Sequence, residues 1–170
     1  MGQSKRYEIH FAKWNDSGTS FRTAWERNFN ARQYQVQYWP MKLLVDTSVN
    51  SEQGDDEREI IGCCGLRPYD LDHHIYEMGI HLKEKYWGKG YAQEACLGVM
   101  EYAFNNTINL NVSSLFAGHH PDNTSSAHLL KKLGFQFTHN EYYAPTGLLH
   151  PSYLMKKDEY FKQQEVHRHD

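Results

Sequence analysis

Two glycines, Gly88 and Gly90, stand in the segment of this sequence that is best suited to bind an anion. Before them, Ile75, Met78, Ile80 and Leu82 are apolar residues among polar neighbours, which predicts a largely buried strand. After them, from Ala92 to Phe104, apolar residues recur at three- and four-residue steps, which predicts a helix with one apolar face. Glycines let the backbone approach a ligand closely, and the first N–H groups of a helix have no partner inside it. Strand, turn and helix N-terminus together predict a site for a diphosphate.

Two well-known phosphate-binding motifs do not fit these residues. A dinucleotide-binding fingerprint needs a third small residue three places after its second glycine, where this chain has Gln93. A P-loop needs a glycine five residues before its Gly-Lys pair, where this chain has Lys83, and Ser or Thr after the pair, where it has Gly90. Both mismatches argue against a nucleotide-binding protein.

A resemblance to a known family rests on two stretches. Residues 85–90 read KYWGKG and resemble the pyrophosphate turn of the GNAT acetyltransferases, Gln/Arg-x-x-Gly-x-Gly/Ala, with Lys85 in the first position. The longer run YWGKGYAQEA is similar to the ribosomal-protein N-terminal (RimJ/RimL-type) branch. A second stretch, PDNTSS at residues 121–126 followed by Leu-Gly-Phe at 133–135, is similar to the family's P-x-N-x-x-S…L-G-F segment. The resemblance covers roughly residues 59–137.

The resemblance implies an acetyl-CoA-dependent N-acetyltransferase that acts on a primary amine, with a protein N-terminus as the first acceptor to consider. A small-molecule amine (a polyamine, an amino acid or an aminoglycoside) is an alternative acceptor, and a non-catalytic CoA-binding module is an alternative function. The resemblance places the following residues at the cofactor: Ile80, His81, Leu82, Lys85, Trp87, Gly88, Lys89, Gly90, Tyr91, Ala92, Asn123 and Ser126.

Acetyl transfer to an amine needs a base. An amine with a pKa near about 10.4 is neutral in only about 1 molecule in 10³ at pH 7, which adds roughly 4–5 kcal/mol to the barrier. Glu77 is the first candidate, because this branch of the family usually has Glu at that strand position. His81 is the second, because the ordinary pKa of imidazole suits proton transfer at neutral pH.

The oxyanion and the departing thiolate also need partners. Backbone N–H groups near residues 80–82 would hold the oxyanion. Ser126 matches the family position near the sulfur of the cofactor, and Tyr142, Tyr143 and Tyr153 are alternative proton donors that the sequence does not rank. The chain contains no nucleophile elbow, so direct attack in a ternary complex is expected rather than an acyl-enzyme.

Composition bounds the remaining possibilities. With 170 residues the chain is expected to form a single domain, residues 1–170. A net charge of -3 and scattered basic residues argue against a nucleic-acid partner, and no apolar run approaches the roughly 18 residues of a membrane span. The three cysteines argue against a disulfide framework, and with no signal peptide the expected location is the cytoplasm. The spacing of the histidines fits no usual metal site, so no metal is expected; monomer and homodimer both stay open.

The chain therefore predicts an α/β fold of the GNAT type: a mixed, mostly antiparallel sheet of six or seven strands flanked by about four helices. Further strands are expected at 7–11, 41–46, 58–66, 109–117, 134–143 and 150–156, helices at 21–30 and 123–133, a turn at 68–74, and frayed polar residues after 156. Adjacent Cys63 and Cys64 should face opposite sides of their strand as small buried residues. Phe21, Trp25 and Phe29 form a stripe that packs on the sheet or lines the acceptor pocket.

Overall fold

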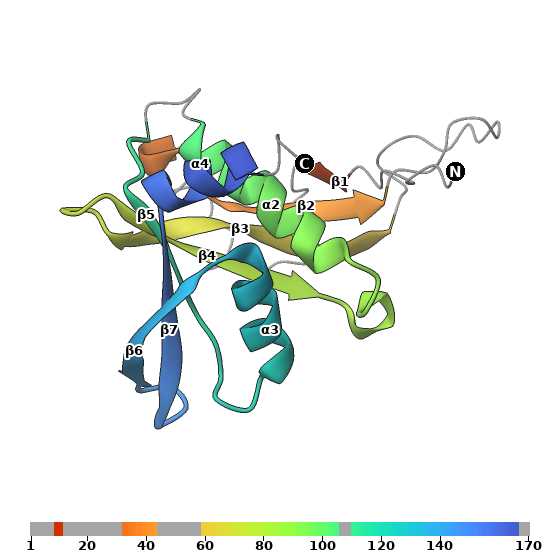
Figure 1. The fold of residues 1–170 in the computed structure, drawn as a ribbon. Helices are drawn as coiled ribbons and strands as arrows, with labels where there is room; N and C mark the ends of the chain where they lie inside the picture. Colours follow the sequence, from red (N-terminus) through yellow and green to blue (C-terminus); the bar gives the residue numbers. More distant parts are fainter. Residues whose placement is uncertain (1–8, 12–31, 44–58, 106–109, 167–170) are drawn as a thin grey trace.

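A single mixed sheet forms the centre of the molecule (Figure 1). The structure is a computed structural model that describes residues 9–11, 32–43, 59–105 and 110–166. Its strands are β1 (Ile9–Phe11), β2 (Tyr38–Leu43), β3 (Ile60–Asp70), β4 (Ile75–Leu82), β5 (Ser114–Gly118), β6 (Gln136–Tyr143) and β7 (Leu148–Lys156). Their order is β1-β2-β3-β4-β5-β7-β6, and only the β4–β5 pair is parallel. The prediction of a mixed, mostly antiparallel sheet is confirmed.

Helices cover the sheet at the places where its apolar residues gather. Helix α2 (Tyr91–Phe104) packs on β3 and β4, α3 (Thr124–Leu133) packs beside it, and α4 (Lys157–Val166) contacts β7. A short 3-10 turn, η2 (Glu84–Tyr86), joins β4 to the segment before α2. The helix expected at 21–30, with its aromatic stripe, lies outside the described residues. Among the helices that are described, none is long and apolar enough to cross a bilayer.

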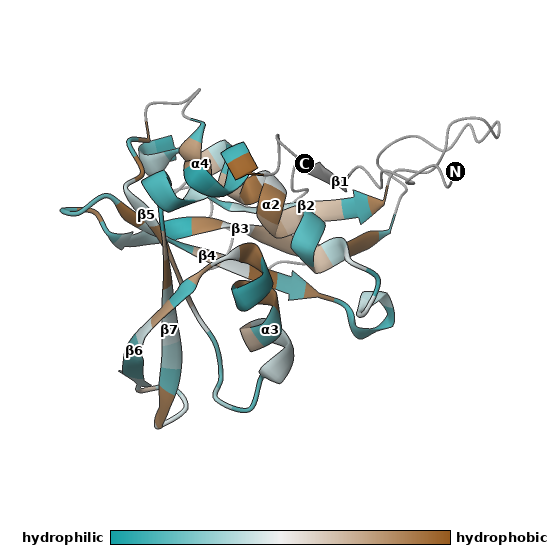
Figure 2. Ribbon diagram, viewed as in Figure 1, coloured by the Kyte–Doolittle hydropathy of each residue, from teal (hydrophilic) through white to brown (hydrophobic). Residues whose placement is uncertain are grey.

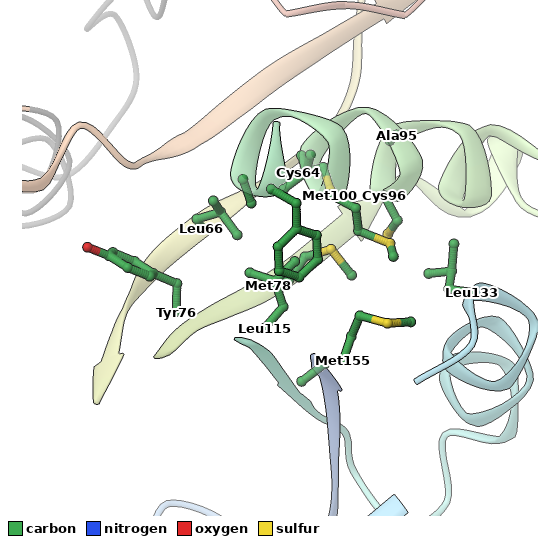
Figure 3. Packing of buried hydrophobic residues seen from close by; sticks show 14 of the residues in the cluster. Cys64, Leu66, Tyr76, Met78, Ala95, Cys96, Met100, Leu115, Leu133 and Met155 are labelled. Carbon is green, nitrogen blue, oxygen red and sulfur yellow. The ribbon is translucent and has the colours of Figure 1, made fainter. Parts of the chain in front are cut away.

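The core lies between α2 and the sheet, where the apolar residues gather (Figure 2). On β4, Tyr76 and Met78 are buried, and Met78 lies near Cys96 and Met100 of α2 (Figure 3). Because side chains alternate along a strand, the other set on β4 points to the opposite face. That set contains Glu77, so burial of the apolar set directs the candidate base away from the core.

The cysteines behave as small core residues with one exception. Cys64 is buried and Cys63 only partly buried, so the prediction of opposite faces is confirmed and the prediction that both are buried is wrong for Cys63. A hydrogen bond with Cys96 of α2 and burial together raise the pKa of the Cys64 thiol well above its usual range. All three are free thiols.

The C-terminal residues differ from the expectation of a frayed tail. Residues 157–166 form α4, whose sequence is polar around most of its circumference. One residue, Tyr160, is 5% exposed and packs against Phe104 of α2, with ring centroids 4.9 Å apart. A single aromatic anchor docks this helix, and such a contact leaves no periodic apolar pattern in the sequence.

Several strands have different bounds from those expected. Strand β2 already begins at Tyr38, before Pro40, and β7 begins at Leu148. Strand β3 continues to Asp70, through Pro68, which the sequence placed in a turn. The ladder with β4 is irregular between Pro68 and Asp70, and such a bulge tolerates a residue that lacks an N–H group. Strand β5 begins only at Ser114, although Leu110 and Val112 before it are buried.

Candidate functional site

Strands β4 and β5 begin as neighbours and then part (Figure 1). Their ladder consists of Ile75 with Ser114, Tyr76 with Leu115, and Glu77 with Phe116. Beyond Glu77, β4 stays paired with β3 only, and β5 stays paired with β7 only. The edge of β4 from residue 78 to residue 82 therefore presents backbone groups to the opening, as an edge strand does.

The glycine turn opens onto this gap. Gly88 has φ +70° and Gly90 φ +86°, and a Cβ built on either residue would meet nothing within 4 Å. Gly90 is the N-cap of α2 and supplies no side chain to bond the first N–H groups of the helix. Those N–H groups and the helix dipole favour an anion, and the open space gives it room. The turn thus fits a diphosphate.

A cavity of about 850 Å³ runs from this turn to α3. It is lined by most residues expected at the cofactor: Ile80, His81, Leu82, Trp87, Gly88, Gly90, Tyr91, Ala92, Asn123 and Ser126. Asn123 accepts a hydrogen bond from the backbone N–H of Ser126 at 3.0 Å, which confirms its predicted role as the cap of α3. The indole N–H of Trp87 donates to the carbonyl of Leu82 at 2.8 Å and so ties the turn to the end of β4.

Two lysines expected at the cofactor do not line the cavity. The Lys85 ammonium donates to Glu59 Oε2 at 2.8 Å. The Lys89 ammonium lies 5.6 Å from the centroid of the Tyr86 ring. Without a ligand, the two ammonium groups are thus engaged with Glu59 and with the Tyr86 ring.

Glu59 organises the approach to the turn. Its carboxylate accepts hydrogen bonds from Lys83 at 3.0 Å, Lys85 at 2.8 Å and the Tyr86 hydroxyl at 2.8 Å. The bonds from Lys85, Lys83 and Tyr86 lower the pKa of Glu59 to about 2. One carboxylate thus links the start of β3 to η2.

We expect this cluster to stabilise the fold above the ordinary carboxyl pKa and to lose that effect in acid. Because the folded pKa of Glu59 is about 2 and its ordinary value is 4.5, the stabilisation is complete above pH 4.5 and disappears as pH falls toward 2. Thermal melting of the wild type and of Glu59→Gln should differ at pH 6 and converge at acid pH. A difference in melting temperature that stays the same from about pH 6 down to about pH 2 would contradict this assignment.

A second cavity, of about 380 Å³, continues from the first toward the beginning of the gap. The two cavities share Ile80, His81, Asn123, Ser126 and Leu129. Residues that line only the second cavity include Tyr38, Arg67, Glu77, His119 and Tyr143. Glu77 and the glycine turn therefore lie at opposite ends of one connected space.

Glu77 is held in an ion pair across the sheet. Arg67 and Glu77 are register partners on β3 and β4, and Arg67 Nε and Nη2 lie 2.7 Å and 2.6 Å from Glu77 Oε2. Burial disfavours the charge of the guanidinium, but the charge and hydrogen bond of Glu77 outweigh burial and raise the pKa of Arg67.

Tyr38 of β2 lies across the sheet between the two candidate bases. Tyr38 pairs with Gly65, and Gly65 pairs with Gly79, so the three residues form one row across β2, β3 and β4. A Cβ on Gly79 would overlap the Tyr38 hydroxyl and lie 2.9 Å from Tyr38 Cζ. Glu77 and His81 flank Gly79 on the same face of β4. Burial, and then the charge of Glu77, raise the pKa of the Tyr38 phenol.

We expect Gly79→Ala to displace the Tyr38 ring and to destabilise the fold by about 1–3 kcal/mol, because the added methyl group overfills the site. The matched control is the same substitution in a Tyr38→Ala background, where the obstacle is gone. Denaturant unfolding of the four proteins gives the coupling energy. An equal loss in both backgrounds would mean that Tyr38 is not the obstacle.

On the β5 side, one tyrosine lines the second cavity directly and another reaches it through a histidine. Tyr143 lines the cavity, whereas Tyr142 is 65% exposed and does not. His119 is buried, and its Nε2 lies 3.4 Å from the hydroxyl of Tyr153. Its Nδ1 lies 2.7 Å from the carbonyl of His120, so Nδ1 carries the proton and Nε2 accepts from the tyrosine. Ser126, at the start of α3, lines both cavities.

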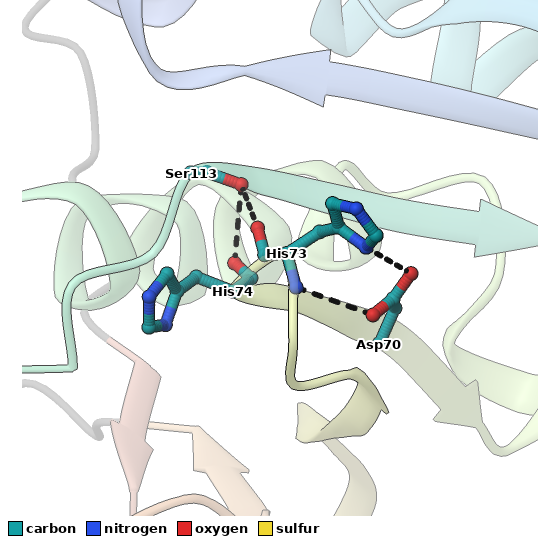
Figure 4. Close-up of polar contacts among 4 residues, drawn as sticks. All are labelled: Asp70, His73, His74 and Ser113. Atoms are coloured by element: carbon teal, nitrogen blue, oxygen red, sulfur yellow. Dashed lines mark hydrogen bonds and ion pairs between the residues drawn. The ribbon is translucent and has the colours of Figure 1, made fainter.

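The histidines of the β3–β4 turn have structural partners. Asp70 accepts from the backbone N–H of His73 at 3.2 Å, and its Oδ2 lies 2.8 Å from the His73 ring nitrogen (Figure 4). The Ser113 hydroxyl donates to the His73 carbonyl at 2.6 Å, which ties this turn to the start of β5. Within the described ranges, no group of three or more His, Cys, Asp or Glu residues is placed to hold a metal ion.

Sequence reasoning missed Tyr38, Arg67 and His119. Arg67 follows the predicted end of its strand by one residue, and the strand in fact continues past it. An alternation count extended through Arg67 would have placed it on the same face as Cys63 and Gly65. Tyr38 and His119 carry no local signal, because their contacts with Gly79 and Tyr153 come from distant segments.

Comparison with known proteins agrees with this geometry. The family model described as the acetyltransferase (GNAT) domain matches residues 4–136. The chain belongs to this family. A relative named uncharacterized N-acetyltransferase p20, from Bacillus licheniformis, is 38% identical over 78 residues, which cover 46% of this chain and 42% of that protein. The chain spans about half the length of the curated relatives that it matches.

Solved structures of the GNAT fold include enzymes with different acceptors. A mutant form of the spermidine/spermine N-acetyltransferase SpeG from Vibrio cholerae has a TM-score of 0.63 at 17% identity, covering 85% of this chain and 78% of that one. A ribosomal-protein-S5-alanine acetyltransferase from Vibrio fischeri has a TM-score of 0.60 at 20% identity, covering 78% and 68%. At these identities the likeness shows the fold alone, and the specific branch stays a prediction.

Proposed function

We propose that this GNAT domain, taken as one domain over residues 1–170, is an acetyl-CoA-dependent N-acetyltransferase that works by direct attack of an amine in a ternary complex. The observation that carries the proposal is the separation of β4 from β5 after Glu77. In the gap between the strands, the cavity that reaches the glycine turn is continuous with the cavity lined by Glu77. One connected space can therefore hold the donor and the amine together.

The donor end is built from backbone groups. The N–H groups at the turn and at the start of α2 would bind the diphosphate. The free edge of β4 at Ile80, His81 and Leu82 would bond the pantetheine arm and the oxyanion. Acetyl-CoA supplies a thioester whose acetyl carbon an amine can attack.

Glu77 and His81 both line the second cavity, which we assign to the acceptor, and both stay candidates for the base. The ring of Tyr38 lies between them, with ring centroids of Tyr38 and His81 6.1 Å apart. An amine that reaches Glu77 is therefore separated from His81 by this ring, unless a water links them. Glu77 is the first choice because it lies where the two strands part.

Ser126, Tyr143 and Tyr153 are the candidates to hold the proton for the leaving sulfur. Ser126 and Tyr143 line the cavity, and Tyr153 contacts it through His119. Tyr142 was a fourth candidate, and its exposed position outside the lining makes it the weakest.

The acceptor is a primary amine, and a protein N-terminus and a small amine both need consideration. The structures with this fold include a polyamine enzyme and a ribosomal-protein enzyme by name. A CoA-binding module without catalysis is the alternative function. The presence of Glu77 at the branch point of the two strands favours an enzyme.

The test combines calorimetric titration of the wild type with acetyl-CoA and CoA, and a thiol-release assay with a panel of amines. We expect micromolar binding, and thiol release that requires an amine whose acetylation is verified by mass spectrometry. Binding without turnover of any amine would favour the non-catalytic module. Absence of binding would refute the proposed function.

A further inference from the structure

We propose that the amine acceptor is an α-amino acid, with its carboxylate bound by Arg67 and its amine presented to Glu77. This inference rests on the proposed function and names its substrate class. It comes from an ion pair that lies inside the acceptor cavity and that the proposed reaction by itself does not require.

The geometry of the ion pair leaves N–H donors of Arg67 and one carboxylate oxygen of Glu77 available to a ligand. Both contacts from Arg67 go to Oε2 of Glu77, from Nε at 2.7 Å and from Nη2 at 2.6 Å. A guanidinium has five N–H donors, so the rest of the fork, Nη1 included, can bind a carboxylate. The side chain of Arg67 is 52% exposed, which makes it accessible to a ligand. Among the described contacts, Oε1 of Glu77 is left to accept from an amine.

The charges of the cavity match a zwitterion. Apart from histidines, Arg67 and Glu77 are the charged residues in the described part of the lining. A polyamine carries several positive charges, and here it would meet one carboxylate that is already paired. The nearby Glu141 lies within hydrogen-bonding distance of the Tyr69 hydroxyl, at 3.3 Å, and does not line the cavity. An α-amino acid, in contrast, brings one negative and one positive group to one guanidinium and one carboxylate.

The size of the cavity supports a small acceptor. A volume of about 380 Å³ is at the lower end of the range for small-molecule sites, and part of it is shared with the donor cavity. Tyr38 closes the space above Gly79. Such a space suits a compact acceptor better than an extended one.

With the ligand carboxylate on the guanidinium, the ammonium group of the amino acid is presented to Oε1 of Glu77. The ammonium of the amino acid gives its first proton to Glu77, from which it passes to water. The amine nitrogen then forms its bond to the acetyl carbon as the carbon–sulfur bond breaks, and the second proton ends on the sulfur.

The experiment measures kcat/KM at saturating acetyl-CoA for free L-amino acids, for the primary amide of each, and for spermidine. The amide keeps the amine and side chain but lacks the carboxylate. We expect the best free amino acid to exceed its amide by about 10- to 100-fold, as a charge-assisted contact implies. In Arg67→Gln this acid-to-amide ratio should fall toward 1. In Arg67→Lys, which keeps the charge but not the fork, it should be intermediate.

The outcomes test the amino-acid acceptor separately from the proposed N-acetyltransferase activity. Calorimetry of Arg67→Gln with acetyl-CoA shows whether the variant is folded and binds the donor. Equal rates for acid and amide, a preference for spermidine, or no turnover of any free amino acid by an enzyme that binds acetyl-CoA would overturn the inference. An acid-to-amide ratio that survives Arg67→Gln would also overturn it. The proposed function itself would be refuted by a wild type that fails to bind acetyl-CoA, or by one that binds acetyl-CoA and turns over no amine of any class.

Discussion

Substitution of Gly88 by Glu is expected to weaken acetyl-CoA binding by roughly 100-fold or more, about 3 kcal/mol. Gly88 has φ +70° and open space where a side chain would stand, next to the start of α2. A glutamate would fill the space proposed for the diphosphate and add a negative charge beside it. Calorimetric titration with acetyl-CoA measures the loss directly.

Gly147 offers a matched control. It lies in the turn between β6 and β7, has φ +68°, and also has nothing within 4 Å of a built Cβ. Gly147→Glu therefore introduces the same charge and the same backbone strain, about 1–2 kcal/mol, at a residue that does not line the cavity next to the glycine turn. If both variants lose binding equally, the cause is general destabilisation. If neither does, the turn is not the diphosphate site.

Glu77→Gln is expected to lower kcat by about 10²- to 10⁴-fold while leaving the Kd for acetyl-CoA close to that of the wild type. Glutamine has nearly the same shape but cannot take the proton of the amine. The measurement pairs the kcat of the thiol-release assay with calorimetry, because a loss confined to kcat points to chemistry rather than to donor binding.

Glu77→Gln removes the proposed base and also leaves the charge of Arg67 unpaired, so a control must show which of the two lowers kcat. In the double variant Arg67→Gln/Glu77→Gln no charge is left unpaired. Its kcat should stay as low as that of Glu77→Gln if the missing proton acceptor is the cause. Recovery of kcat in the double variant would instead assign the defect to the exposed cation.

His81→Gln distinguishes the second candidate base. If Glu77 is the base, we expect this variant to lose much less kcat than Glu77→Gln, because Tyr38 lies between His81 and Glu77. A larger loss in His81→Gln, together with a Glu77→Gln variant that keeps most of its activity, would reverse the assignment.

The sequence alone determined the parts of this protein that depend on local pattern. The strand pattern from Ile75 to Leu82, the helical period from Ala92 to Phe104 and the cap at Asn123 were each read correctly, because strand, helix and cap formation depend on neighbours within a few residues. The glycine turn belongs with them, since glycine permits the positive φ that Gly88 and Gly90 adopt. The elements that form the proposed donor end could therefore be predicted from the sequence.

The tertiary structure alone decided the acceptor end. The pairing of Arg67 with Glu77 depends on the register between β3 and β4, and the place of Tyr38 depends on a row that crosses three strands. Strands β4 and β5 part because β4 stays paired with β3 and β5 with β7. Helix α4 docks through Tyr160 on Phe104 and through its contacts with β7. These features join residues that are far apart in the chain, so no periodicity within one segment encodes them. The physical reason is that register and packing are set by the whole sheet, whereas turns, caps and helical faces are set by adjacent residues.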